Sequence, residues 1–547
     1  MNAVIKFIFS GLALCSITIS SAQETGFGVA HTSENTLECL SHADREEILA
    51  ILQTRKSSYN SARTEIVKFQ WPIRQSNNYD HSETIGISNY VDLDDSSPGD
   101  LLDYNCGTRT YDTQSGYNHK GTDIYSWPFT WHKMDHDHIE IVAAASGEII
   151  YKQDFNSDKS CAFNNNRWNA VYVEHSDGSV AWYGHLKANS LTNKEEGDQI
   201  EVGEYIGVMG SSGNSTGPHL HLEIYDADNN LIDPYAGSCN STTSQSWWEE
   251  QQDYTIPGIN MLATHDAPPE LGCYGDEEPN FEVNFTSGST VYFATYFRDQ
   301  LDASTSSHRV IRPDGVVYQQ WTTTSPQFYS GSYWYRSFSL PTNGNEGKWT
   351  FQVDYQGQTA SEHFYLTNED PTISLSTRAI TFADYSVEDV ITKSFEIMNT
   401  GSGGILIDRI DYPTGFSGNW DGVIHSSESK TIQFTFVPSD LEEFNNEMVI
   451  RYNGNQSARL TLTNTEILLS ANESLEFQVY PNPAINGKIN IKGASTTSAE
   501  VLNLNGQVLL INTGNETIDV SNLPSGMYLL KITNGKTVKV EKVFVNN

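Results

Sequence analysis

Short β-branched and aromatic runs, separated by turn residues, recur along most of this 547-residue chain and constrain its fold more than any other feature. From Asn105 to about Tyr235 the runs are bounded by Gly, Asn and Asp, and no stretch keeps a helical period of useful length. We expect strands there at Ile139–Ala143, Val171–Glu174, Val180–Tyr183 and Leu220–Tyr225. The pattern predicts a mainly β, multidomain protein, since the length suffices for roughly three to five domains.

Composition excludes several classes of protein. The 28 Tyr and 11 Trp argue against a disordered chain, which has few aromatic residues. The 69 acidic residues against 32 basic ones give a net charge of −37. A chain this acidic does not bind nucleic acid by neutralising phosphates, nor does it attach to an anionic membrane surface.

The first 22 residues are typical of a secretory signal peptide. Lys6 supplies the positive charge, Phe7 to Ile19 the apolar stretch, and residues 20–22 the small residues of a cleavage site. Cys15 follows Leu14, where a lipoprotein signal needs a small residue, so we reject lipidation. No later stretch reaches the ~20 apolar residues of a membrane span, and we expect no stable membrane insertion.

Removal of the signal leaves five cysteines, which meet an oxidising environment after export. They are Cys39, Cys106, Cys161, Cys239 and Cys273. Their order suggests the pairs Cys106–Cys161 and Cys239–Cys273, although sequence alone cannot fix connectivity. Cys39 is then left over.

The remaining chain divides by composition. Residues 23–100 are expected to be a pro-like lead-in, with a helix from an N-cap at Ser41 to about Arg55. Its acidic loop, Asp92, Asp94 and Asp95, either binds calcium or is simply solvated, and the spacing fits no EF-hand.

Residues 240–257 resemble a polar linker that carries Trp247 and Trp248. Two β-sandwiches of immunoglobulin type are expected at 258–367 and 370–465. Six Lys against five acidic residues from Glu476 onward mark a separate module at 474–547.

Residues 101–240 hold the side chains that carry chemistry. In a strand over Leu220–Tyr225 and the two residues before it, His219, His221 and Glu223 would share one face, and the leucines between them would point into a core. His119 and Asp123, four apart across a glycine, can complete a metal site with this histidine pair. Two His and one carboxylate with an open position are the donor set of a catalytic zinc site.

Three local motifs together resemble a known family. They are Asn118-His119-Lys120-Gly121-Thr122-Asp123, Tyr183-Gly184-His185-Leu186, and the run from Gly210 to His221 that contains Ser-Thr-Gly-Pro-His-Leu-His. In this order they resemble the lysostaphin/LytM-type zinc metallopeptidases, the peptidoglycan endopeptidase family that includes staphylolysin and β-lytic endopeptidase. The resemblance covers about 130 residues and implies an antiparallel β-sheet metallopeptidase domain over 101–240.

Carried over residue by residue, the resemblance implies one zinc ion, Zn2+, held by His119, Asp123 and His221. It also implies that His185 and His219 are catalytic histidines that do not bind the metal. The leftover Cys39 is then either an idle free thiol or a thiolate that caps the metal while the enzyme is latent. No HExxH helix is present, so a thermolysin-type glutamate base does not apply.

A further histidine cluster and two accessory modules remain. His132, His136 and His138 suggest either a second metal site or, as we expect, a mobile loop beside the active groove, which Trp127 and Trp131 would line. Residues 370–465 resemble immunoglobulin-like domains of the Hydin type, and we favour a spacer role. The tail resembles a type IX secretion sorting domain of Bacteroidota, a small β-sandwich, through Tyr480-Pro481-Asn482-Pro483, Asn503-Leu504-Asn505-Gly506 and its closing lysines.

The sequence therefore predicts a secreted zinc metalloendopeptidase that acts on peptidoglycan cross-bridges or glycine-rich peptides. Its partners are the substrate and the type IX secretion machinery, and we expect a monomer, released or attached at the outer cell surface. The alternatives are an extracellular protease of matrix-type proteins and a non-catalytic cell-wall-binding or activator protein. Intact His185 and His219 favour an active enzyme.

Overall fold

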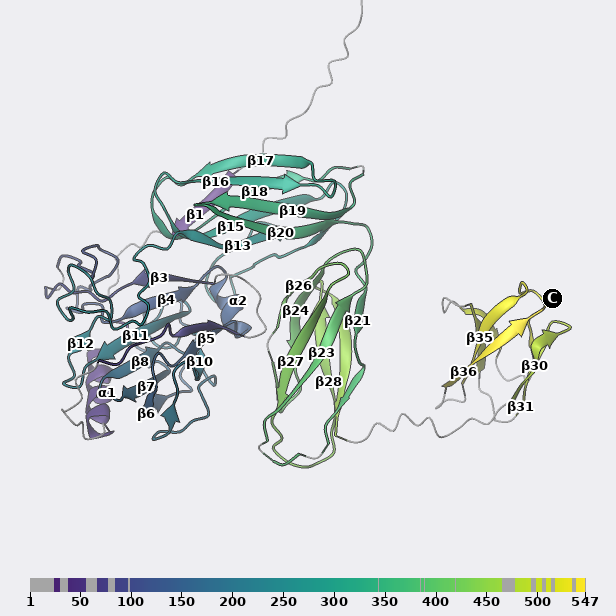
Figure 1. The fold of residues 1–547 in the computed structure, drawn as a ribbon, viewed down its shortest axis with the longest axis horizontal. Helices are drawn as coiled ribbons and strands as arrows, with labels where there is room; N and C mark the ends of the chain where they lie inside the picture. Colours follow the sequence, from purple (N-terminus) through teal and green to yellow (C-terminus); the bar gives the residue numbers. More distant parts are fainter. Residues whose placement is uncertain are drawn as a thin grey trace, which may run out of the picture. The chain divides into compact units, whose positions relative to one another are not determined.

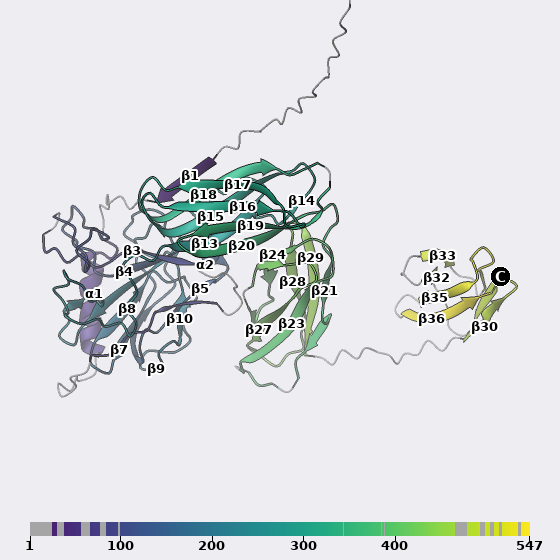
Figure 2. The same ribbon diagram turned by 45° about the horizontal axis from the view of Figure 1, so that its top comes forward.

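Strands dominate the described chain. The computed structural model describes residues 24–29, 38–55, 66–76, 84–96, 99–342, 344–383, 385–387, 389–418, 420–464, 478–492, 498–503, 508–512, 517–533 and 538–546. Within these residues the helices are α1 (His42–Arg55) and α2 (Thr130–Asp135), and the strands number from β1 to β36. The expected mainly β, multidomain fold is confirmed (Figure 1, Figure 2). The expected signal peptide lies outside the described residues.

The N-terminal domain (residues 38–254) contains two antiparallel sheets. The larger sheet has the order β3-β4-β11-β8-β7-β6-β9, with β12 paired to β11, and the smaller has the order β10-β5-β2. The strands of the larger sheet are β3 (Ile85–Asn89), β4 (Thr122–Ser126), β6 (Gly147–Gln153), β7 (Ala170–His175), β8 (Val180–Gly184), β9 (Gln199–Ile200), β11 (His219–Tyr225) and β12 (Leu231–Ile232). Those of the smaller sheet are β2 (Ile73–Gln75), β5 (Ile139–Val142) and β10 (Tyr205–Val208). All four predicted strands of this domain are confirmed.

Both faces of the larger sheet are buried. Leu220, Leu222 and Ile224 of β11 lie in the main core, as the alternation of the strand predicts. On the other face, Tyr172 and Trp182 pack beneath helix α1 with its buried Ile48 and Leu52. Figure 1 shows α1 lying along this sheet.

Helix α1 begins where the sequence predicts. The hydroxyl of Ser41 accepts a hydrogen bond from the backbone N–H of Asp44 at 3.1 Å, which satisfies one free donor of the first turn. The helix ends at Arg55.

Residues 66–96, which we assigned to a pro-like lead-in, are built into the same sheets. β2 pairs with β5, β3 pairs with β4, and Phe69 is fully buried in the main core. A boundary at residue 101 is therefore too late, because these short apolar runs complete one edge of each sheet.

The expected linker at 240–257 is also wrong. Trp247 and Trp248 are buried in the main core, and the N–H of Phe69 donates to the carbonyl of Trp247 at 2.8 Å. The sequence did not indicate this packing, because the residues around the two tryptophans are polar, although the two indole rings of this segment enter the core.

Truncation of Trp248 tests this packing. Trp248→Ala is expected to lower the free energy of unfolding of the N-terminal domain by about 3–5 kcal/mol, since a large buried ring is removed. Urea unfolding followed by fluorescence measures it. The exposed Gln245 of the same segment gives a control, Gln245→Ala, which should change stability by less than about 0.5 kcal/mol. Equal effects of the two variants would restore the linker interpretation.

The first sandwich combines two sheets, with the orders β1-β18-β15-β13 and β14-β20-β19-β16-β17. Its strands are β1 (Glu24–Val29), β13 (Gly258–His265), β14 (Asn284–Phe285), β15 (Thr290–Gln300), β16 (Thr305–Ile311), β17 (Val317–Thr324), β18 (Tyr329–Ser339), β19 (Gly347–Tyr355) and β20 (Gln358–Leu366). Phe293, Trp349 and Phe351 lie in its core. Strand β1 comes from the N-terminal segment and pairs with β18.

The second sandwich has sheets of order β21-β23-β27-β25 and β22-β29-β28-β24-β26. Its strands are β21 (Ile373–Leu375), β22 (Ala379–Thr381), β23 (Ile391–Asn399), β24 (Ile405–Asp411), β25 (Phe416–Ser417), β26 (Gly422–Ile424), β27 (Ser429–Phe436), β28 (Asn445–Tyr452) and β29 (Gln456–Thr463). Hydrophobic residues alternate along β27, with Ile432, Phe434 and Phe436 buried.

The C-terminal residues belong to a separate compact unit. Its strand order is β33-β32-β35-β36-β30-β31-β34. The strands are β30 (Gln478–Ile485), β31 (Lys488–Lys492), β32 (Ser498–Leu502), β33 (Val508–Asn512), β34 (Thr517–Asp519), β35 (Gly526–Thr533) and β36 (Val538–Val545). The motif from Tyr480 to Pro483 lies in β30, whereas residues 504–506 of the expected hairpin turn lie outside the described residues.

The disulfides differ from the pairing that chain order suggested. Cys106 bonds Cys239, and Cys161 bonds Cys273. The fold brings residue 239 next to Tyr104, whose carbonyl accepts from the N–H of Cys239. Cys39 is buried and not bonded to another cysteine. Among the described helices, none is long and apolar enough to cross a membrane.

Candidate active site

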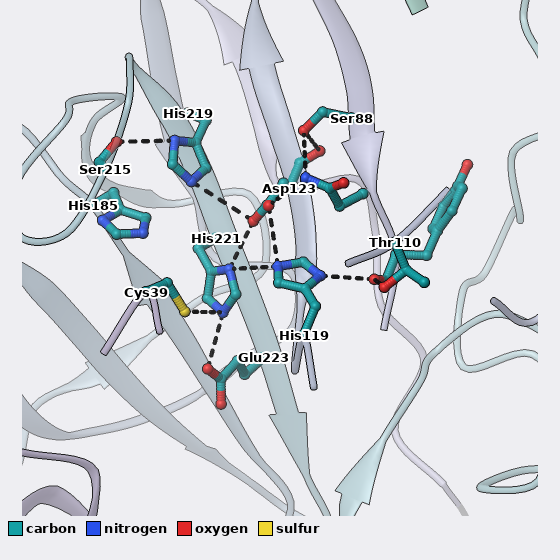
Figure 3. A network of polar contacts seen from close by, with 12 residues as sticks. Cys39, Ser88, Thr110, His119, Asp123, His185, Ser215, His219, His221 and Glu223 are labelled. Atoms are coloured by element: carbon teal, nitrogen blue, oxygen red, sulfur yellow. Dashed lines mark hydrogen bonds and ion pairs between the residues drawn. The ribbon is translucent and has the colours of Figure 1, made fainter. Parts of the chain in front are cut away.

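Three neighbouring strands bring the five predicted site residues together. β11 lies between β4 and β8, and its His221 is paired with Asp123 on one side and Gly184 on the other. His185 directly follows Gly184, and His119 precedes β4. Figure 3 shows all five side chains turned toward one region.

His119, Asp123 and His221 form a compact buried cluster. Nε2 of His119 lies 3.2 Å from Nδ1 of His221 and 3.0 Å from a carboxylate oxygen of Asp123. Nδ1 of His221 lies 2.7 Å from the other oxygen of Asp123. Asn89 donates to the same carboxylate at 2.9 Å and orients it.

In His119 and His221, one ring nitrogen points away from the cluster, and its hydrogen bond determines which nitrogen of the neutral ring carries a lone pair. Nδ1 of His119 donates to the carbonyl of Tyr90 at 2.7 Å, and Nε2 of His221 donates to Glu223 at 2.9 Å. In the neutral form of both rings the two inner nitrogens carry lone pairs and face each other next to a carboxylate. Two such lone pairs and a carboxylate can bind one cation, so this donor set fits a metal ion with two imidazoles and one carboxylate as ligands.

Gly121 makes the close approach of these side chains possible. A Cβ at this position would lie 2.8 Å from Nε2 of His221, well inside van der Waals contact. Glycine between His119 and Asp123 is therefore a steric requirement of the cluster.

His185 and His219 lie beside the cluster with their rings 4.4 Å apart. Nδ1 of His185 donates to the carbonyl of Ser212 at 2.6 Å, and Nδ1 of His219 donates to that of Gly217 at 2.8 Å. Both Nε2 atoms are thus left with lone pairs. Nε2 of His185 has no hydrogen-bond partner within the described part of the chain, and Nε2 of His219 lies 3.7 Å from Asp123.

Electrostatics keep these two imidazoles neutral. Burial lowers the pKa of His185 well below its usual value, and the nearby His219 and His221 lower it further. Burial likewise lowers the pKa of His219, partly opposed by Asp123. His185 also has a left-handed backbone, with φ at 62°, a strained conformation of the kind that is common at functional sites.

Helix α1 supports the cluster of His119, Asp123 and His221 from behind. Arg45 donates to both carboxylate oxygens of Glu223, at 2.6 and 2.7 Å, and the hydroxyl of Tyr225 donates to Glu223 at 2.7 Å. Glu223 in turn accepts from His221, so α1 fixes the orientation of this imidazole. The sequence placed Glu223 on the face of His221, but no sequence signal links it with Arg45.

Cys39 lies on the far side of His221. Its Sγ is 3.7 Å from Nε2, the nitrogen that bonds Glu223, and 2.8 Å from the hydroxyl of Tyr117. The thiol therefore lies away from the side of the ring that faces His119 and Asp123. The interpretation of Cys39 as a cap on the metal is not supported by this placement.

A cleft of about 540 Å³ opens onto Asp123 and His219. Trp127 and Trp131 line it, as the sequence predicts. Ser330 and Gly331 of the first sandwich complete the wall, and the hydroxyl of Tyr125 donates to the carbonyl of Ser330 at 2.8 Å. The first sandwich therefore contributes to the cleft, which its sequence did not indicate.

Two other predicted groups lie apart from the cluster. In the acidic loop one oxygen of Asp92 accepts from the N–H groups of Asp94 and Leu102. The cluster of three histidines around α2 does not line the cleft. His132 and His138 instead contact Asp421 of the second sandwich, so these histidines do not face the groove, although Trp131 of the same helix lines it.

The comparisons with known proteins agree with this geometry. Residues 117–234 match the family model described as Peptidase family M23. Residues 117–234 form a peptidase family M23 domain. The resemblance to lysostaphin/LytM-type peptidases is thereby confirmed. Residues 371–465 match the HYDIN/CFA65/VesB-like, Ig-like domain, and residues 478–546 match the secretion system C-terminal sorting domain. This tail directs the chain to the cell surface or the extracellular space by type IX secretion.

Curated relatives share only parts of the chain. DD-carboxypeptidase/endopeptidase Mpg of Neisseria meningitidis is 49% identical over 55 residues, 10% of this chain and 12% of that protein. Peptidoglycan DD-endopeptidase ShyC of Vibrio cholerae is 32% identical over 97 residues, 18% of this chain and 22% of that protein. Lysostaphin of Staphylococcus staphylolyticus is 27% identical over 165 residues, 28% of this chain and 32% of that protein. The matches thus span at most about a third of the length of these relatives.

Removal of the guanidinium behind the M23 cluster tests the role of α1. Arg45→Ala leaves Glu223, whose side chain is fully buried, without its ion-pair partner. We expect the free energy of unfolding to fall by about 3–5 kcal/mol, measured by urea titration. The control is Glu47→Ala on the same helix, whose ion pair with Arg167 is about half exposed and should contribute about 1 kcal/mol or less. Equal losses would contradict a buried clamp.

Proposed function

We propose that this protein is a secreted zinc metalloendopeptidase that hydrolyses peptide bonds in peptidoglycan cross-bridges or glycine-rich peptides. The observation that carries the proposal is the convergence of one ring nitrogen each of His119 and His221, 3.2 Å apart, with the Asp123 carboxylate, beside a cleft in an M23 domain. A single divalent cation can be held by all three of these side chains at once.

We assign His119, Asp123 and His221 as the ligands of one zinc ion. Two imidazoles and a carboxylate, with positions left open to the cleft, suit zinc better than calcium or magnesium, which prefer oxygen ligands. A bound zinc ion polarises the scissile carbonyl and lowers the pKa of a water molecule toward about 7.

His185 and His219 move the protons. Each anchors Nδ1–H on a backbone carbonyl and offers a neutral Nε2 to the cleft side of the cluster. One imidazole takes the proton of the attacking water, and the other stabilises the oxyanion or protonates the leaving amine. Their rigid backbone anchors keep both Nε2 atoms oriented, which reduces the reorganisation needed during the reaction.

The lining of the cleft supports an uncharged peptide as substrate. Among its described residues Asp123 is the single carboxylate and none is lysine or arginine, whereas Tyr125, Trp127 and Trp131 supply aromatic surface. The net charge of −37 offers no long-range attraction for an anionic cell-wall polymer, so local contacts with the peptide must provide specificity. The names of relatives such as peptidoglycan DD-endopeptidase ShyC support the same substrate class.

The proposed roles predict a metal-dependent hydrolysis that needs His219. Purified peptidoglycan incubated with the wild-type protein should release free amino groups. A chelator should abolish the release and added zinc should restore it. His219→Ala should retain zinc and lower kcat/KM by about 10²–10⁴-fold, because one proton-transferring group is lost.

His42 provides the matched control, since its side chain is 77% exposed and lies on α1; His42→Ala should behave like wild type. If peptidoglycan stays intact but a glycine-rich protein is cleaved, the matrix-protease alternative is correct. If the chelated protein or His219→Ala keeps the biological activity of the untreated wild type, a non-catalytic binding protein is favoured instead.

A further inference from the structure

A second group of metal-binding side chains lies outside the proposed zinc site. His132 lies on α2 and His136 follows four residues later, directly after the helix, so that their rings lie 4.1 Å apart. Asp137 has a positive φ of 53°, and the turn it makes brings His138 back to the same side. The His138 ring lies 5.7 Å from that of His132 and 5.5 Å from that of His136.

The second sandwich supplies a carboxylate to these three imidazoles. Asp421 directly precedes β26, and its Oδ2 lies 3.0 Å from Nε2 of His132. Its other oxygen, Oδ1, contacts Nε2 of His138. Asp421 is only 8% exposed, so a carboxylate of one domain is buried among the histidines of another.

The donor atoms have the spacing of a metal site. His132, His136 and Asp421 each offer one ligand atom, and these atoms all lie within 4.8 Å of one another. Nδ1 of His136 lies 2.8 Å from the carbonyl of His132 and donates to it, which leaves Nε2 as the nitrogen with a lone pair. One carboxylate surrounded by three imidazoles exceeds what a simple ion pair needs, and imidazole with carboxylate is a donor set suited to zinc-like transition ions.

We propose that His132, His136 and Asp421 bind a second divalent transition-metal ion, which joins the M23 domain to the second sandwich. His138 is a positioning residue in this site, because it holds the other oxygen of the Asp421 carboxylate. A cavity of about 500 Å³ is lined by His132, Trp420 and Asp421, so two of the three proposed ligands border it. The sandwich is therefore fixed to the M23 domain through a metal and is more than a spacer.

Metal content of the full chain tests the second site independently of the proposed function. After dialysis against zinc and gel filtration, the wild type should hold two zinc ions per chain by elemental analysis. His119→Ala, which removes a ligand of the first site, should hold one, and His119→Ala with His136→Ala should hold none. His425 lines the same 500 Å³ cavity outside the cluster, so His119→Ala with His425→Ala should still hold one.

A second measurement guards against a misfolded double variant. His119→Ala loaded with cobalt should show d–d absorption of a nitrogen- and oxygen-ligated ion, and Asp421→Asn in that background should weaken cobalt binding at least tenfold. A His119→Ala variant that holds no metal would overturn the inference, as would unchanged cobalt affinity after Asp421→Asn. If only the proposed function is wrong, the result differs: the protein does not hydrolyse peptidoglycan, but the second ion is still bound.

Discussion

The antiparallel pairing of β11 with β4 and β8 is the constraint on which the M23 site depends. It sets His221 directly opposite Asp123 on one neighbour and next to Gly184 on the other. A slip of one residue in either register would turn the histidines of β11 toward the core and its leucines toward the cleft. The buried leucines that prevent such a slip, Leu220 and Leu222, alternate with the two histidines. Core packing and site assembly are thus the same interaction.

The N-terminal segment acts on this site from the outside of the sheet. Arg45 of α1 donates to Glu223, and Glu223 accepts a hydrogen bond from His221. The helix therefore orients His221 through two consecutive hydrogen bonds. The packing of α1 on Tyr172 and Trp182 means that this helix also covers apolar surface. A segment with both roles is part of the folded N-terminal domain, and its removal would expose the sheet and leave His221 without this support.

Sequence reasoning succeeded where a local pattern determines the outcome. Period-two alternation placed His219, His221 and Glu223 on one face, and a serine before an acidic first turn located the start of α1. It failed where contacts depend on the path of the whole chain. Cys106 bonds Cys239 because the fold brings these two distant parts of the chain together, and the order of the cysteines along the chain does not predict that contact. Trp247 looked like part of a linker because its neighbours are polar, although burial of its ring depends on Phe69, far away in sequence.

The two sandwiches differ in how they bear on the M23 domain. The first is tied to it by the Cys161–Cys273 disulfide and contributes Ser330 and Gly331 to the wall of the cleft. Because the oxygen of Ser330 accepts from Tyr125, a displacement of this sandwich would alter the aromatic side of the cleft as well. The second sandwich contacts the N-terminal domain through Asp421, which lies against His132. Neither residue is among those that line the cleft. The first sandwich therefore borders the cleft directly, whereas the second contacts His132 of α2, a helix whose Thr130 and Trp131 border the same cleft.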